Sequence, residues 1–93
     1  MSALSGQTTV TTAGTAVALG TTQVNAPIIV KALDTNTGAV AVGNDGGGDV
    51  TMSNGFRLQA GEVIPFAYVG SLASLYVDSE VNGEGVCWSV VDL

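Results

Sequence analysis

Short runs of alternating apolar residues, each closed by a turn signal, constrain this chain more than any other feature. In residues 38–62, GAVAVGNDGGGDVTMSNGFRLQAGE, alternating Ala and Val lead into a glycine-rich loop and then into Asn54-Gly55. Successive side chains of a strand point to opposite faces, so Val40 and Val42 share one face. Asn-Gly between short alternating runs is typical of a tight hairpin, because both residues tolerate a positive φ. The stretch therefore predicts a β-meander with a hairpin turn at Asn54-Gly55.

The same pattern continues along the chain, and no window has the period of a helix. Candidate strands include residues 28–33, 62–69 and 86–91, separated by residues that favour turns. Seven or eight such short strands predict an all-β fold, an antiparallel β-sandwich of jelly-roll-like form. Residues 1–6 have no periodicity and are predicted to be a flexible N-terminal arm, with residues 7–93 forming a single β-sandwich domain.

The phase of the alternation predicts which side chains lie between the two sheets. Pro65 cannot donate to a strand ladder, so the strand that contains it is expected at a sheet edge or at a bulge. The residues expected in the core are Val40, Val42, Ile64, Phe66, Leu75, Val77 and Trp88.

Charge is scarce in this sequence. Charged residues make up 11% of the 93 residues, and 46% of the residues are apolar. An isolated soluble domain normally covers its exterior with charges of both signs, so part of this exterior is predicted to be buried against other protein. The net charge is −6, and Lys31 and Arg57 are the only basic side chains. Binding to nucleic acid or to an anionic membrane needs clustered basic residues. We therefore predict that neither nucleic acid nor a membrane is a partner.

The single cysteine and the N-terminal residues bear on where the protein is made and whether it is secreted. Cys87 is the one cysteine, so no internal disulfide can form. The first ten residues, MSALSGQTTV, have neither a basic segment nor a continuous apolar run, and no signal peptide is predicted. The most apolar run, residues 26–33, is too short to span a bilayer. Synthesis in the cytoplasm is expected.

The residue types offer little catalytic chemistry. Histidine is absent, which removes the usual general base and the commonest metal ligand. Cys87 has no activating partner and is interpreted as a small filler on the second face of its strand. The glycine-rich loop at residues 43–48 lacks the Lys-Ser/Thr pair and the helix of a phosphate-binding loop. We therefore predict no enzyme activity, no catalytic residue and no cofactor.

One acidic segment has a spacing that suits calcium. Residues 78–83, DSEVNG, place oxygen ligands at alternate positions and a glycine at the sixth, as in the first half of a calcium loop. Position twelve of that loop is Ser89 instead of the bidentate Glu. A hairpin turn at Asn82-Gly83 is therefore the favoured interpretation, and no metal site is predicted.

Two further constellations have simpler explanations. Glu80 and Glu84 flank the same turn, which explains their proximity without the paired carboxylates of a glycosidase. Trp88, Tyr68 and Tyr76 could form a platform for stacking against sugars, but core packing needs most of so few aromatic side chains.

Three segments of the chain have sequence patterns that are informative in combination. They read I-x-VKA-x-x-x-NTG-x-V-x-VG, SNG-x-x-L-x-AGE and L-x-x-LYVD-x-x-VNGEGV, and they lie at residues 28–43, 53–62 and 72–86. In combination they resemble a group of small bacteriophage virion proteins. Modules of that group decorate or cement the capsid shell, or form β-structured parts of head fibres and spikes. The resemblance covers about half of the chain and brings no catalytic residue with it.

The resemblance implies a non-enzymatic virion structural protein, a capsid cement or decoration protein at the capsid surface, with the major capsid protein as its partner. The alternative, from another class, is a receptor- or glycan-binding module of a phage head fibre or tail spike, and a hydrolase comes third. The low charge and small size also predict a homo-oligomer. The resemblance implies a two-fold or three-fold position on the capsid, and a trimer is expected ahead of a dimer.

Overall fold

The structure, a computed structural model, describes residues 4–91 except for the side chain of Tyr68. These residues form eight strands and one 3-10 turn. The elements in chain order are β1 (Ser5–Val10), β2 (Val17–Ala18), β3 (Gln23–Ala32), β4 (Val40–Gly43), β5 (Phe56–Leu58), β6 (Val63–Ser71), η1 (Leu72–Ser74), β7 (Tyr76–Ser79) and β8 (Glu84–Val90).

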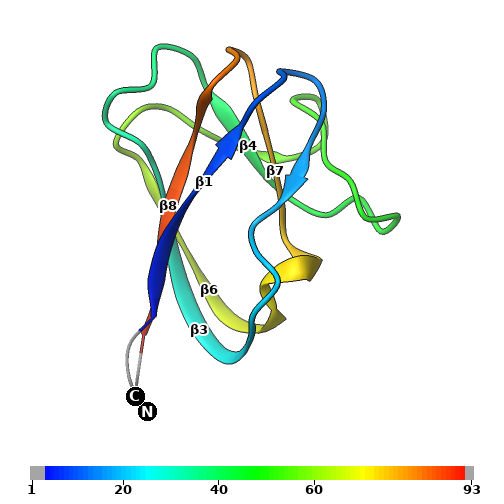
Figure 1. Cartoon of the computed structure of the whole chain (residues 1–93), viewed down its shortest axis with the longest axis vertical. Helices are drawn as coiled ribbons and strands as arrows, with labels where there is room; N and C mark the ends of the chain where they lie inside the picture. The colour runs from blue at the N-terminus through cyan, green and yellow to red at the C-terminus, as the bar shows by residue number, and fades with distance from the viewer. Residues whose placement is uncertain (1–3, 92–93) are drawn as a thin grey trace.

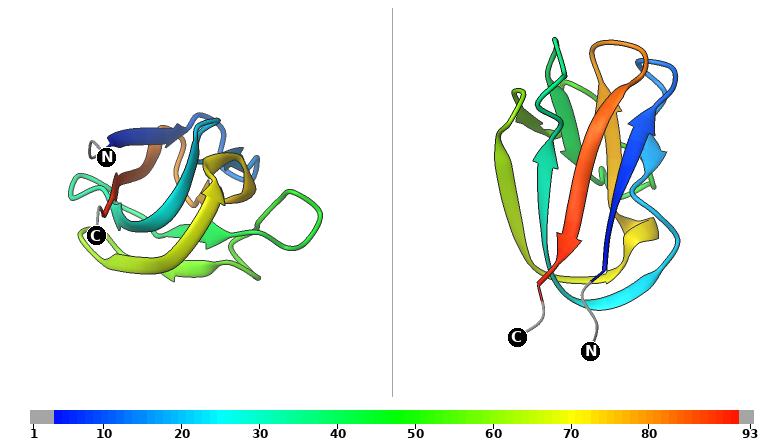
Figure 2. Two further views of the ribbon diagram at one scale, coloured as in Figure 1. Left: turned by 90° about the horizontal axis from the view of Figure 1, so that it is seen from below. Right: turned by 60° about the vertical axis from the view of Figure 1, so that its left-hand side comes forward.

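The strands form two four-stranded sheets that lie face to face (Figures 1 and 2). Sheet A has the order β1-β8-β3-β6, and sheet B has the order β2-β7-β4-β5. Every neighbouring pair is antiparallel. The first strand thus pairs with the eighth, the second with the seventh, the third with the sixth and the fourth with the fifth, which is the jelly-roll arrangement. The predicted antiparallel, jelly-roll-like sandwich is confirmed.

The connections gather at two opposite ends of the sandwich. The β1–β2, β3–β4, β5–β6 and β7–β8 connections meet at the upper end of Figure 1, here called the loop end. The β2–β3 connection and η1 lie at the lower end, here called the terminal end, where β1 begins and β8 finishes.

The core lies between the sheets and follows from the alternation along β3. Its even-numbered residues, from Val24 to Ala32, are buried, and its odd-numbered residues point away from the core. Ile28 and Val30 have no exposed surface. Of the predicted core residues, Val40, Val42, Leu75 and Val77 are buried, whereas Ile64, Phe66 and Trp88 are only partly buried and pack against the core.

The predicted β-meander is wrong. Only β4 and β5 are consecutive strands that pair with each other, and each other connection among the described residues leads from one sheet to the other. The turn at residues 34–38 and the turn at Asn82-Gly83 therefore cross between sheets instead of closing hairpins. Gly83 does take a positive φ of 83°, as a turn at this position requires.

The predicted hairpin at Asn54-Gly55 is also wrong, because residues 50–53 form no strand and β5 pairs with β4. Gly55 N–H donates to the Thr51 carbonyl at 2.9 Å and closes a turn inside the β4–β5 loop. A Cβ atom at Gly55 would lie 2.6 Å from Val50 Cγ2 and 2.7 Å from Ala41 Cβ. Glycine is needed here for close packing of the loop on the sheet.

The predicted arm of residues 1–6 is too long. β1 begins at Ser5, and Gly6 pairs with Trp88. The Leu4 carbonyl accepts a hydrogen bond of 2.7 Å from Val90 N–H, which ties this residue to β8 as well. Residues 1–3 lie outside the described part of the chain.

Candidate functional site

The outward side of sheet A leaves large apolar side chains exposed, and we call it the open face. It carries a hollow of about 400 Å³. A volume of this size falls within the range of ligand and peptide pockets. The hollow is lined by Ser5, Gly6, Gln7, Ile29, Lys31, Val63, Cys87, Trp88 and Ser89.

Strand register sets the outward side chains of sheet A in two rows that cross all four strands. Antiparallel pairing aligns Gln7 with Cys87, Cys87 with Lys31, and Lys31 with Val63. The second row runs from Ser5 through Ser89 and Ile29 to Pro65. Uncharged polar or small side chains therefore lie on the β1 and β8 side of the open face, and larger apolar ones lie with Lys31 on the β3 and β6 side.

The open face combines exposed apolar side chains with very few acids. Ile29 is 39% exposed and Val63 is 51% exposed, although both are large hydrophobic residues. Glu84, at the first position of β8, is the one acidic residue in the four strands of sheet A. Lys31 pairs with Asp34 at 3.2 Å, but both side chains are exposed, so this ion pair contributes little to stability.

The outward side of sheet B, in contrast, is covered by the protein's own loops. Ala39 and Ala41 lie on that side and have no exposed surface. The β4–β5 loop covers Ala41 with Val50, which is 2% exposed. From the β1–β2 connection, Gly14 N–H donates to Asp78 Oδ1 at 2.9 Å, and Asp78 is 2% exposed. One face of the sandwich is therefore closed by its own chain, and the other is not.

Cys87 lies in the floor of the hollow on the open face. It is half-buried, carries a free thiol and pairs across the sheet with Gln7 on one side and Lys31 on the other. Its side chain points away from the core, on the face opposite to that of Trp88, as the alternation predicted. The residues that line the hollow with it include no imidazole that could act as a base for the thiol, and Lys31 is the one charged residue among them.

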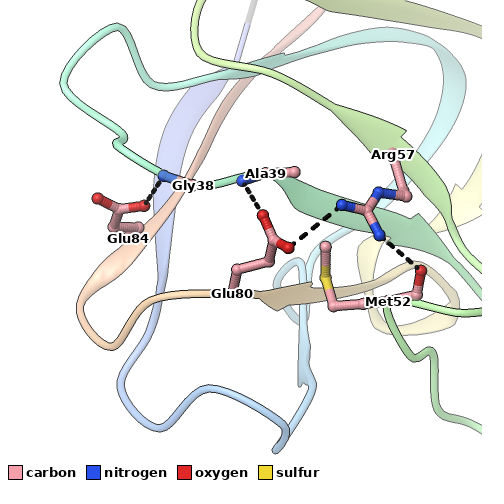
Figure 3. A network of polar contacts seen from close by, with 6 residues as sticks. All are labelled: Gly38, Ala39, Met52, Arg57, Glu80 and Glu84. Carbon is pink, nitrogen blue, oxygen red and sulfur yellow. Dashed lines mark hydrogen bonds and ion pairs between the residues drawn. The ribbon is translucent and has the colours of Figure 1, made fainter.

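The acidic residues of the loop end bind backbone groups of neighbouring turns. Glu84 accepts hydrogen bonds from Thr37 N–H at 2.7 Å and from Gly38 N–H at 3.0 Å. Glu80 accepts from Ala39 N–H at 2.7 Å and pairs with Arg57 at 3.2 Å, as Figure 3 shows. These two carboxylates hold the β3–β4 connection to the β7–β8 connection. Glu80 and Glu84 are close to each other because they flank the same turn, as the sequence predicts.

Glu84 gives the loop end a dependence on pH. The backbone N–H groups of Gly38 and Thr37 hold the pKa of this carboxyl below its ordinary value of 4.5. A lowered pKa in the folded state means that the ionised carboxylate stabilises the fold. This contribution is complete above the ordinary pKa and is lost as the pH falls through the lowered one.

We expect Glu84→Gln to unfold at lower urea concentration than the wild type at pH 7, because a neutral amide binds the two N–H groups more weakly. The difference should shrink as the pH falls below 4.5, where the wild-type carboxyl becomes protonated. Urea unfolding of both proteins from pH 7 to pH 3 tests this. A difference of the same size at both ends of that range would contradict the role given to Glu84.

In the two segments considered for calcium and for phosphate, the polar groups bind the protein's own backbone. At residues 78–83, Asp78 Oδ1 is bonded to Gly14 N–H and to Ser79 N–H at 2.8 Å. Within residues 4–91, no group of three or more His, Cys, Asp or Glu side chains is arranged to hold a metal ion. In the loop at residues 43–48, Asn44 Oδ1 accepts from Gly46 N–H and Gly48 N–H. These loop N–H groups are therefore engaged by the loop's own side chain.

The aromatic residues do not come together in a platform. Trp88 belongs to sheet A and Tyr76 to sheet B. The Trp88 indole lies over Gly6, where a Cβ atom would be 2.9 Å from its Cζ2, and it packs against the core. The side chain of Tyr68 lies outside the described part of the structure. A sugar-stacking surface made jointly by Trp88 and Tyr76 is therefore ruled out.

The open face itself could not be singled out from the sequence. Alternation along residues 28–33 puts Ile29 and Lys31 on the face opposite to Ile28 and Val30, but nothing local distinguishes them from Ala39 and Ala41, which occupy the same kind of position. The difference arises because the β4–β5 and β1–β2 connections fold over sheet B. The useful signal was the large size of Ile29 and Val63 against the small size of the alanines, since small side chains suit close cover by a loop.

Comparison with known proteins gives no relative: no family model matches the chain, and no curated protein or solved structure shows significant similarity. Within residues 4–91 there is no helix of the length and hydropathy needed to cross a bilayer.

Proposed function

We propose that this protein is a non-enzymatic structural protein of a bacteriophage virion, which cements or decorates the capsid by docking on the major capsid protein. The three segments that resemble small virion proteins support the class. The jelly-roll sandwich agrees with it, because this architecture recurs in viral shell proteins. In this proposal the protein lies on the capsid surface of the virion and acts through protein–protein contacts.

The observation that carries the proposal is the difference between the two outward faces of the sandwich. Sheet B has buried outward residues, with Ala39 and Ala41 fully covered, while Ile29 and Val63 of sheet A are exposed. An apolar surface with very few charges at its centre is the composition of an interface core. The open face is therefore the surface that we assign to the capsid shell.

Val63→Asp tests this assignment, because it places a charge on the exposed apolar part of the open face, on strand β6. An unpaired charge buried in an interface costs about 2–5 kcal/mol, so we expect capsid affinity to fall by about thirtyfold or more. The measurement is co-sedimentation of the purified protein with capsids that lack it. The fold should be retained, since Val63 is 51% exposed in the free protein.

Phe56→Asp is the matched control for that experiment. Phe56 is 58% exposed, more than Val63, but it lies on β5 in sheet B. We expect its replacement to leave capsid affinity unchanged. Equal losses from the two variants, or a loss from Phe56→Asp alone, would contradict docking through the open face.

A receptor- or glycan-binding module of a head fibre or tail spike is the second candidate. The hollow favours it, because hydroxyl and amide groups of Ser5, Gln7 and Ser89 stand beside exposed apolar surface in a space of about 400 Å³. Small-ligand sites combine an apolar lining with a few polar groups in this way. Saturable binding of an oligosaccharide by free protein, together with no binding to capsids, would favour this function over the first.

A further inference from the structure

Three of the four sheet edges among residues 4–91 are protected against the addition of another strand. In sheet B, β2 has two residues and β5 has three, which is too short to pair with a new strand. In sheet A, β6 contains Pro65 and has a register shift opposite residues 26–28. Short strands, proline and irregular register are the devices that keep sheet edges from pairing.

The edge formed by β1 has none of these devices. Its six residues, SGQTTV, contain no proline and no charge. All six pair with β8 in one unbroken register. An uncharged and regular edge of this length is a template for another strand.

The free hydrogen-bonding groups of β1 can be assigned from the bonds that it makes with β8. Val90 N–H donates to the Leu4 carbonyl, so the even-numbered residues exchange bonds with β8. In an antiparallel ladder the odd-numbered residues then turn their N–H and C=O groups outward. Those residues are Ser5, Gln7 and Thr9, whose side chains are exposed and whose backbone groups have no other described partner.

We propose that the protein forms a two-fold dimer in which β1 pairs antiparallel with β1 of a second copy. The two copies of sheet A then become one eight-stranded sheet. Two-fold symmetry brings the same edge of both copies together, so one open edge is sufficient. Cross-strand neighbours at this junction would be Ser, Gln and Thr side chains, which bring no like charges together.

The distribution of acids favours this dimer over the trimer expected from the sequence. Five acidic residues lie at the loop end: Asp34, Glu62, Asp78, Glu80 and Glu84. Two more, Asp45 and Asp49, lie in the β4–β5 loop, which contacts η1 through the hydrogen bond from Asn44 Nδ2 to the Ser74 carbonyl, while residues 19–25 and 71–75 include no acid. Antiparallel pairing of β1 sets the loop end of one copy beside the terminal end of the other and so keeps the two groups of five acids apart. A ring of copies in one orientation would gather all the loop ends together and would raise charge repulsion.

The dimer would also enlarge the open face. Ser5 and Gln7 of β1 line the hollow, so the hollows of the two copies would adjoin at the junction. The result is a continuous outward surface over eight strands. A standard interface takes about 800 Å² from each partner, and a joined surface supplies this more readily than the face of one small sheet.

Gln7→Pro tests the pairing with little change to the fold. Proline at this position removes an N–H group that points away from β8, and sheet edges tolerate that change. The loss of two or three backbone hydrogen bonds corresponds to about a hundredfold increase in the dimer Kd. Gln7→Lys is the second variant, because a lysine on an edge strand opposes pairing without altering the backbone. Ala73→Lys, at an exposed position of η1, is the control for added charge.

Sedimentation velocity of the free protein from micromolar to millimolar concentration gives the result, with far-ultraviolet circular dichroism to verify the fold. We expect the wild type and Ala73→Lys to be dimers, and Gln7→Pro and Gln7→Lys to be monomers. A wild type that stays monomeric or forms a trimer, or dimers that persist in both Gln7 variants, would overturn the proposal. No capsids are present, so this outcome is independent of the test of capsid docking.

Discussion

Gly85→Ala is expected to lower the free energy of unfolding by about 3–5 kcal/mol, because no space exists for a methyl group at this position. An added Cβ would overlap the carbonyl oxygen of Thr8 and would lie 2.9 Å from Thr9 Cα. Both obstacles are backbone atoms of β1, so neither can rotate away as a side chain could. Strand β1 would have to move away from β8.

Such a movement is opposed by the hydrogen bonds on the other side of Gly85. Its carbonyl accepts from Asn36 Nδ2 at 2.8 Å and from Leu33 N–H at 3.2 Å, and its N–H donates to Asn36 Oδ1 at 3.3 Å. Asn36 is 8% exposed, so bonds lost there would not be replaced by water without further change. The strain cannot be relieved on either side.

Chemical unfolding measures this effect, and Gly47→Ala is its control. Gly47 lies in the exposed β4–β5 loop, where a Cβ would meet only Asp45 Oδ1, at 3.4 Å. We expect the control to change the free energy of unfolding by no more than about 0.5 kcal/mol. A Gly85→Ala protein within 1 kcal/mol of the wild type would show that β1 and β8 are not packed as described.

Ile28→Ala is expected to cost about 2–5 kcal/mol, the range for removal of a large aliphatic side chain from a closed core. Ile28 has no exposed surface and pairs with Val90 on one side and Phe66 on the other, in the middle of sheet A. The strands on either side cannot collapse on the cavity, because their hydrogen bonds with β3 fix their distance from it.

Ile29→Ala is a close control, since the same residue type stands one position along the same strand on the opposite face. Ile29 is 39% exposed, so its truncation should cost less than about 1 kcal/mol of stability. The same variant should weaken binding to capsids, because it removes apolar surface from the open face. Equal losses of stability at positions 28 and 29 would contradict the assignment of core and outward faces.

The class of fold was predictable because its signals are local. Alternation along residues 28–33 placed Ile28 and Val30 on one face, and these residues are buried in the structure. Alternation along residues 86–91 puts Val86, Trp88 and Val90 on one face; Val86 and Val90 are buried, and Trp88 is partly buried against the core. A period of two residues and frequent turns are sufficient to indicate a β-sandwich.

The path of the chain between the strands was not predictable, because turn chemistry shows where a chain reverses but not which sheet it enters next. Asn82-Gly83 has the residues of a hairpin turn, yet it joins β7 of sheet B to β8 of sheet A. Asn54-Gly55 lies in a loop whose role is to bury Val50 over Ala41. Both outcomes depend on contacts between segments that are distant in sequence.

The candidate site depends on those distant contacts even more strongly. The sequence predicts that no catalytic residue or cofactor is present, and this stays a prediction. The sequence does not distinguish the outward residues of sheet A from those of sheet B, because cover by a loop is a property of the whole fold. Ile29 and Val63 are therefore identified as site residues only by the structure.

Electron cryomicroscopy of capsids incubated with the purified protein tests the central claim most directly. The proposal predicts added density at regular positions on the shell, with the strands of sheet A facing the capsid and sheet B, covered by its β4–β5 loop, facing solvent. Capsids that show no added density after incubation with an excess of the protein would contradict the proposed function. Added density in which sheet B or the loop end meets the shell would contradict docking through the open face.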